Sequence, residues 1–270
     1  MFRDRGIEIK TPDQIALMRR AGLVVAEALS LLTTAVRPGV TTLELDALAE
    51  EHIRSRGATP NFLGYHGFPA TICASVNDEV VHGIPGGRVL ADGDLVSLDC
   101  GAIVDGWHGD AAVTVAVGQV GDELVELMRV CEESLWRGLA AARLGGRVSD
   151  ISAAIAASVR ASGDYGIVED YVGHGIGSAM HMPPSVPNFG RPGRGPKLVE
   201  GMALAVEPMI TMGTIETRVL EDDWTVVTAD GSWSAHFEHS FTLTPRGTLV
   251  LTAEDGGAAR LAELGVPCAA

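Results

Sequence analysis

The fold of this 270-residue chain is decided by residues 95–110, which read LVSLDCGAIVDGWHGD. An apolar run ends at Asp99, and Asp105-Gly106 is the strongest hairpin-turn signal in the region. A two-residue turn there makes Val104 face Trp107, so that the numbers of facing residues sum to 211. The stretch therefore predicts two antiparallel strands in a fixed register.

That register brings two carboxylates together. Asp99 then faces Ala112 and Asp110 faces Gly101, so the two acids are diagonal neighbours on one face, roughly 7–8 Å apart at the backbone. Two bare carboxylates held this close repel each other, and one of them takes up a proton. A divalent cation between them removes the conflict, so the hairpin is a candidate for part of a metal site.

A second copy of this pattern lies further along the chain. Residues 92–99 match residues 200–207 at an offset of 108, and residues 108–110 match residues 236–238 at an offset of 128. The change of offset requires about 20 inserted residues between the two matches. We interpret the shared order as an internal duplication, with chance resemblance among β-rich stretches as the alternative. The predicted halves are about 11–118 and 119–252.

The duplication places an acid at each equivalent position. Asp99 and Asp110 in the first half correspond to Glu207 and Glu238 in the second. A carboxylate that ends a buried strand costs several kcal/mol unless it is paired, neutralised or bound to a cation. The four acids are therefore the strongest candidates for a functional centre.

Histidines supply the remaining chemistry. His174 lies among glycines, which leave space for an ion or a substrate; His181 follows it, and His82 lies in a segment of turn-forming residues. A set of two Asp, two Glu and one His suits Mn, Fe(II), Co or Mg better than a structural zinc site. For any single histidine, and for His52 or His66 in particular, a structural role is the alternative.

The composition excludes several classes of function. The chain has 35 acidic and 20 basic residues, a formal net charge of −15, which argues against a protein that binds nucleic acid or an anionic membrane surface. The sequence has no secretory signal and no apolar run of about 18 residues. Its four cysteines include no C-x-x-C pair, so we expect a reduced, cytoplasmic protein.

Helical segments flank the β-rich regions. Capping boxes begin at Thr11 and Thr41, and Ser149 is expected to cap a later helix. The last stretch, residues 254–270, is expected to be a loose tail. The predicted helices cover about 12–35, 42–57, 122–144 and 149–161.

These residues closely resemble the type I methionine aminopeptidases, which are pita-bread metallopeptidases. A lone GHGIG would be a weak signal, but the matching stretches follow the family's order over almost the whole chain. They are 65–69, 75–85, 92–99, 106–110, 173–177, 207–209 and 224–239. The resemblance implies an α+β fold of the pita-bread (creatinase/aminopeptidase-like) type. In this fold a pseudo-twofold antiparallel sheet is covered by helices, here as a single catalytic domain over 1–270.

The resemblance also implies a dinuclear centre that binds two divalent metal ions. In the family pattern Asp110 and Glu238 bridge the ions, Asp99 completes one site, and His174 and Glu207 complete the other. The ligand types leave Co, Mn, Fe and Zn all open.

The family reaction removes the initiator methionine from new polypeptides when the second residue is small, through attack by a metal-bound hydroxide. By resemblance, Glu207 is the base that takes the proton of the water, His181 stabilises the oxyanion, and His82 lies beside the peptide and assists proton transfer or positioning.

The methionine pocket of the family also maps onto this chain. Taken singly, each of its residues would be read as an ordinary core residue. This chain departs from the family pattern at Phe62, Met180 and His236, which affects the pocket rim or inhibitor selectivity and removes no ligand. The pocket residues are Tyr65, His66, Phe68, Cys73, Met180 and Trp224.

Two alternatives remain. The first is a proline-specific aminopeptidase on the same fold, disfavoured because such relatives carry a large N-terminal domain that this chain has no room for. The second is a peptide-binding module without catalysis, disfavoured because such modules lose ligands that are all present here. The implied partner is the N-terminal methionine of a nascent polypeptide, with a transient ribosome contact and a monomer as the default.

Overall fold

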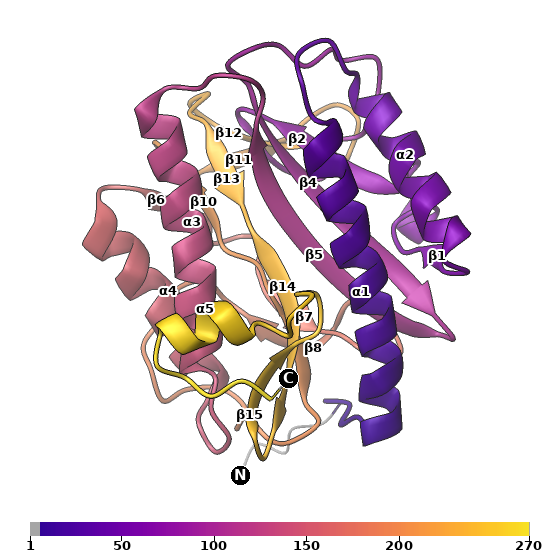
Figure 1. Cartoon of the computed structure of the whole chain (residues 1–270). Helices are drawn as coiled ribbons and strands as arrows, with labels where there is room; N and C mark the ends of the chain where they lie inside the picture. The colour runs from indigo at the N-terminus through magenta and orange to yellow at the C-terminus, as the bar shows by residue number, and fades with distance from the viewer. Residues whose placement is uncertain (1–5, 270) are drawn as a thin grey trace.

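The structure is a computed structural model that describes residues 6–269. Its central element is a twisted nine-stranded sheet with helices packed against it (Figure 1). The strands are β1 (Thr59–Pro60), β2 (Ile72–Val76), β4 (Leu95–Val104), β5 (Trp107–Ala116), β7 (Gly173–Gly175), β8 (Met182–Val186), β9 (Ala203–Val206), β14 (Glu238–Thr244) and β15 (Gly247–Val250). Their order is β1-β4-β5-β14-β9-β7-β8, with β2 also on β4 and β15 also on β14. All of these pairings are antiparallel, as the predicted α+β pita-bread fold requires.

The hairpin that the sequence predicted is confirmed in its register. Strands β4 and β5 pair Val104 with Trp107 and Asp99 with Ala112, and they place Asp110 opposite Gly101. The turn residues Asp105 and Gly106 have φ of 49° and 81°. Positive φ at both central residues matches the right-handed twist of the strands, which is why Asp-Gly is favoured there.

Five α-helices pack around the sheet's edges and one of its faces within the described residues. They are α1 (Pro12–Ala35), α2 (Thr42–Ser55), α3 (Asp122–Ala141), α4 (Val148–Ser162) and α5 (Ala258–Glu263). Both predicted capping boxes are confirmed: the hydroxyls of Thr11 and Thr41 accept from the backbone N–H groups of Gln14 and Glu44, whose side chains accept in return. These reciprocal bonds satisfy N–H groups that a helix start leaves without a partner.

Helix α4 is capped two residues earlier than predicted. The carboxylate of Asp150 accepts from the backbone N–H of Arg147 at 2.7 Å, so Arg147 is the capping residue. The hydroxyl of Ser149, the predicted cap, accepts from the backbone N–H of Arg194 at 2.7 Å instead. A distant loop therefore uses the group that the sequence assigned to the helix start.

Each half of the chain contributes its own apolar cluster. The first is built by α1 and α2 against β2, β4 and β5, with Ala21, Leu45 and Leu98 among its fully buried members. The second is built by α3 and α4 against β9 and β14, with Leu139 and Phe241 among its members. The sheet order places β4-β5 and β9-β14 symmetrically about the contact between β5 and β14. A duplication would give this order, and the division into two halves stays a prediction.

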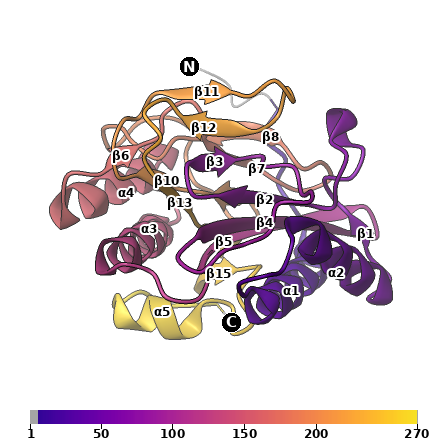
Figure 2. The ribbon, with the colours of Figure 1, turned by 90° about the horizontal axis from the view of Figure 1, so that it is seen from above.

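Two small sheets complete the fold. One pairs β13 (Ser234–His236), β10 (Met209–Thr211) and β6 (Gly166–Ile167), and the other pairs β11 (Thr217–Val219), β12 (Val226–Thr228) and β3 (Glu79–Val81). Figure 2 shows β11 and β12 on one side of β4 and β5, and α1 and α5 on the opposite side. Within residues 6–269, no helix is both long enough and apolar enough to cross a membrane.

The prediction of a loose tail over 254–270 is wrong for the residues that the structure describes. Helix α5 buries Leu261 completely, and the backbone N–H of Ala269 donates to the carbonyl oxygen of Thr248 at 2.9 Å. The guanidinium of Arg19 in α1 also donates to the carbonyl groups of Glu254, the first residue of this segment, and of Val250, Leu251 and Ala253 just before it, at 2.6–3.1 Å. The segment is held by tertiary contacts, and its short sequence, rich in small residues, contains no local pattern that predicts them.

Candidate metal centre and pocket

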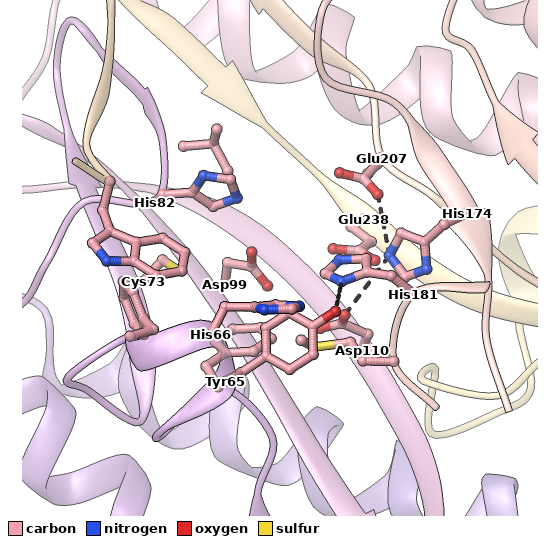
Figure 3. A pocket seen from close by; sticks show the side chains of 15 residues that line it. Tyr65, His66, Cys73, His82, Asp99, Asp110, His174, His181, Glu207 and Glu238 are labelled. Carbon is pink, nitrogen blue, oxygen red and sulfur yellow. Dashed lines mark hydrogen bonds and ion pairs between the residues drawn. The ribbon is translucent and has the colours of Figure 1, made fainter. Parts of the chain in front are cut away.

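One cavity of about 280 Å³ collects all the residues that the sequence predicted for the site (Figure 3). Its walls come from both halves of the chain and from the loop before β2. The lining residues are Phe62, Tyr65, His66, Phe68, Cys73, Val81, His82, Asp99, Asp110, His174, Met180, His181, Glu207, Trp224 and Glu238. The structure thus places these residues together, while their individual roles remain predictions.

The four acids reach this cavity from neighbouring strands. Asp99 and Asp110 lie on β4 and β5, Glu238 is the first residue of β14, and Glu207 directly follows β9. His174, the middle residue of β7, directs its Nε2 atom at them, 3.4 Å from Oε1 of Glu207 and 4.0 Å from Oδ2 of Asp110. Ligand atoms of Asp110, His174 and Glu238 all lie within 4.8 Å of one another, which is the clustering that a metal ion requires.

Burial without compensation raises the proton affinity of these acids. Desolvation raises the pKa of Asp99 from 3.8 to about 7. Desolvation first, and then repulsion among the acids, raises the pKa of Asp110, Glu207 and Glu238 well above the usual range. Among residues 6–269, no arginine or lysine lines the cavity to balance them.

The same acids have oxygen atoms without partners. Oδ1 of Asp99, Oδ1 of Asp110 and Oε1 of Glu238 are buried and accept no hydrogen bond from the part of the chain that the structure describes. A buried polar atom left without a partner costs about 1–3 kcal/mol, and more when it is charged. Divalent cations would satisfy these oxygens and cancel the charge, so the residues present fit a metal centre.

His174 is prepared to act as a ligand. Its Nδ1 lies 3.0 Å from the carbonyl oxygen of Gly175, and since a carbonyl oxygen only accepts, Nδ1 carries the proton. Burial, and then the neighbouring His181, lowers the pKa of His174 to about 3. The ring is therefore neutral at pH 7, with the lone pair of Nε2 directed at the acids.

Two further histidines border the acids. The ring of His181 lies 4.3 Å from that of His174, and its Nδ1 is 2.8 Å from the hydroxyl of Tyr65. His82 stands on the opposite side of the cavity, between the rings of Tyr171 and Trp224 at 5.7 and 6.2 Å. Burial, and then the proximity of His181, lowers the pKa of His82 to about 4. Both imidazoles border the space beside the acids, where a substrate would lie.

An apolar wall faces the acids. The rings of Phe68 and Trp224 meet edge to face at 5.1 Å, and Cys73 and Met180 are buried beside them. Phe62, one of the departures from the family pattern, is buried in the same cluster. Aromatic and sulfur-containing side chains suit a flexible thioether, because sulfur contacts aromatic rings favourably.

One residue near the acids was not predicted to belong to the site. His236 was noted only as a departure, yet its Nε2 lies 4.0 Å from Oε2 of Glu238, and ligand atoms of Glu207, His236 and Glu238 lie within 4.8 Å of one another. The signal that could have found it is the period of two in extended chain, which puts His236 and Glu238 on the same side.

Comparisons with known proteins agree with this geometry. The model of metallopeptidase family M24 matches residues 16–245. The methionine aminopeptidase of Clostridium perfringens is 52% identical over 246 residues, covering 91% of this chain and 98% of the relative. Methionine aminopeptidase 1 of Mycobacterium tuberculosis is 52% identical over 254 residues, covering 92% of this chain and 96% of the relative. A solved structure of methionine aminopeptidase from Thermotoga maritima superimposes with a TM-score of 0.90 at 43% identity, covering 92% of this chain and all of that one.

Proposed function

This chain belongs to metallopeptidase family M24, and from that premise we propose that it is a methionine aminopeptidase. Its reaction is the hydrolytic removal of an N-terminal methionine when the second residue is small. The observation that carries this proposal is the meeting, in one cavity, of four buried carboxylates with an apolar wall of aromatic and sulfur-containing side chains.

The centre takes two divalent ions, held by Asp99, Asp110, His174, Glu207 and Glu238. Support comes from the unsatisfied carboxylate oxygens and from the raised pKa values of the four acids, both of which bound cations would relieve. When bound, such ions lower the pKa of a water molecule and polarise the scissile carbonyl group. The donor set leaves Co, Mn, Fe and Zn open.

The remaining chemistry falls to side chains around the acids. A carboxylate oxygen of Glu207 takes the proton of the attacking water, and that proton then passes to the leaving amine. His181 donates from Nε2 to the oxygen that becomes negative in the transition state. His82, across the cavity, positions the peptide and assists proton transfer. This division needs a neutral His181, and burial, followed by the charge of His66, lowers the pKa of His181.

The cavity also selects the end of the substrate. The positively charged amino terminus of a peptide meets the acids, while the methionine side chain meets Phe68, Cys73, Met180 and Trp224, with Tyr65 and His66 nearby. An internal peptide bond has no ammonium group to place against the acids, so the site is suited to an exopeptidase.

The proposal is tested with peptides Met-Ala-Ser, Met-Leu-Ser and Ala-Pro-Ser, before metal removal, after it and after metal readdition. We expect methionine release from Met-Ala-Ser alone, and only with metal present. Cleavage of Ala-Pro-Ser would favour a proline-specific enzyme, and metal-independent peptide binding without cleavage would favour a binding module.

In the cell the proposed substrate is a nascent polypeptide, so we place the protein in the cytoplasm, as a monomer with transient ribosome contact.

A further inference from the structure

His236 has a fixed backbone and a free ring nitrogen. It ends strand β13, and it is 1% exposed. Its backbone N–H donates to the hydroxyl of Thr114 at 2.8 Å, and the same hydroxyl donates to its carbonyl oxygen at 2.8 Å. Thr114 lies on β5, two strand positions beyond Ala112, which pairs with Glu238. The imidazole is thus anchored against the strand that carries Asp110.

The ring nitrogen Nε2 of His236 has no hydrogen-bond partner among the described residues, although it is fully buried. Oε2 of Glu238, the nearest ionic neighbour, is 4.0 Å away, which is too far for a hydrogen bond. Buried polar atoms are almost always paired, so an unpaired nitrogen directed at carboxylates indicates a missing partner. A divalent cation is a partner that a neutral nitrogen and two carboxylates can share.

The spacing of the atoms fits this partner. Ligand atoms of Glu207, His236 and Glu238 lie within 4.8 Å of one another. A divalent transition metal binds such atoms at about 2 Å, so ligands on opposite sides of one ion lie about 4 Å apart. The ligand atoms of the three residues are thus already near the separation that one shared ion requires, and Thr114 fixes the backbone of His236 on one side of it.

We propose that His236 is a further ligand of the metal centre, where its Nε2 joins Glu207 and Glu238 around one divalent ion. The inference rests on the metal centre proposed above and adds a second imidazole to it. Nitrogen ligands favour Co²⁺, Fe²⁺ and Zn²⁺ over Mn²⁺ and Mg²⁺, which prefer oxygen. The centre of this chain therefore selects more strongly for imidazole-binding metals than one with a single histidine.

The test counts the histidines that bind the metal. The metal-free protein is loaded with Co²⁺, and proton NMR records the strongly shifted, exchangeable imidazole N–H signals that only ligated rings give. We expect two such signals in the natural protein, from His174 and His236, and one in His236→Gln. His239→Gln is the matched control, because His239 lies only three residues away on the next strand, β14, but its Nδ1 pairs with Thr252 and its ring packs on Trp136. This variant keeps both signals.

Calorimetric titration of the metal-free protein provides the second measurement. His236→Gln should weaken Co²⁺ binding by about tenfold or more, and Mn²⁺ binding by less. One shifted imidazole signal in the natural protein, unchanged in His236→Gln, would overturn the proposal and leave the metal centre intact. Absence of any Co²⁺ binding would overturn both. Because the signal count in the natural protein needs no variant, the test holds even if His236→Gln fails to fold.

Discussion

The hydroxyl of Tyr65 lies 2.8 Å from Nδ1 of His181, although 116 residues separate them in the sequence. Burial, and then the charge of Asp110, raises the pKa of Tyr65, so the phenol keeps its proton. When that proton is donated to Nδ1, the proton of the neutral imidazole resides on Nε2. Tyr65 thereby positions His181 as a donor towards the acids.

Tyr65→Phe should therefore lower kcat on Met-Ala-Ser and leave KM nearly unchanged. The fall should be smaller than the 10²–10³-fold loss expected when an oxyanion donor is removed outright, as in His181→Ala. Steady-state kinetics of the two variants make the comparison. An equal loss in both, or a change confined to KM, would contradict a positioning role for Tyr65.

Asp99→Asn should abolish hydrolysis of Met-Ala-Ser and reduce the amount of metal bound, because it removes one negative charge from the proposed ion site. Glu238→Ala should do the same, since Glu238 is another of the proposed metal ligands. Activity is measured by methionine release and metal content by elemental analysis after dialysis.

Asp105→Asn is the matched control on the same hairpin as Asp99. Asp105 lies in the turn, and its ion pair with Arg20 is exposed, so its loss should change stability by less than about 1 kcal/mol. Full activity in the metal-loaded Asp99→Asn protein would contradict the assignment of Asp99 as a metal ligand.

The stability of the metal-free protein should fall as pH rises from 6.5 to 8.5. In this window the unfolded acids have already lost their protons, whereas the pKa of Asp99 is about 7 in the folded protein and those of Asp110, Glu207 and Glu238 are well above the usual range. The folded state binds more protons, so the free energy of unfolding decreases with pH. Urea unfolding with a chelator present measures this slope.

Histidines oppose this trend below pH 6.5. Burial lowers the pKa of His82 and His239 to about 4, and that of His174 and His236 to about 3, so these histidines take up protons in the unfolded chain first. The four acids still bind more protons in the folded state over this range, so the two sets should largely cancel and the stability profile should be flat between about pH 5 and 6.5. Asp99→Asn should reduce the slope above pH 6.5, and a flat profile there in the natural protein would contradict the raised pKa values of the acids.

Leu261→Ala should destabilise the metal-loaded protein by about 2–5 kcal/mol, because it leaves a cavity where α5 packs. The exposed neighbour Ala262 gives the control: Ala262→Ser should stay within about 0.5 kcal/mol. Urea midpoints decide between a docked helix and a loose tail, since a loose tail would make the two variants alike.

The sequence could predict what depends on local pattern. The register of β4 and β5 follows from two turn residues, and the starts of α1 and α2 follow from capping boxes of four residues each. The acids could be found because the pattern around them occurs twice. All these signals lie within short stretches of the chain, where the physical preferences of a few residues decide the structure.

What the sequence did not predict depends on distant contacts. Helix α5 has six residues, too few to be stable without packing on α3, and its position depends on Arg19, more than 230 residues away. His236 lies near Glu207 only because β13 pairs with β10 and β14 pairs with β9. No pattern within either stretch specifies those pairings.

In the large sheet, the described residues join β5 to β14 through two residue pairs, Glu238 with Ala112 and His239 with Ala111. Asp99 and Asp110 lie on the β5 side of this contact, and His174, Glu207 and Glu238 lie on the β14 side. Ions bound by both sets would form a cross-link across this contact. Activity and the stability of this contact would then both depend on the same bound ions. Loss of the metal in the cell would remove the activity and, at the same time, the cross-link that holds β5 against β14.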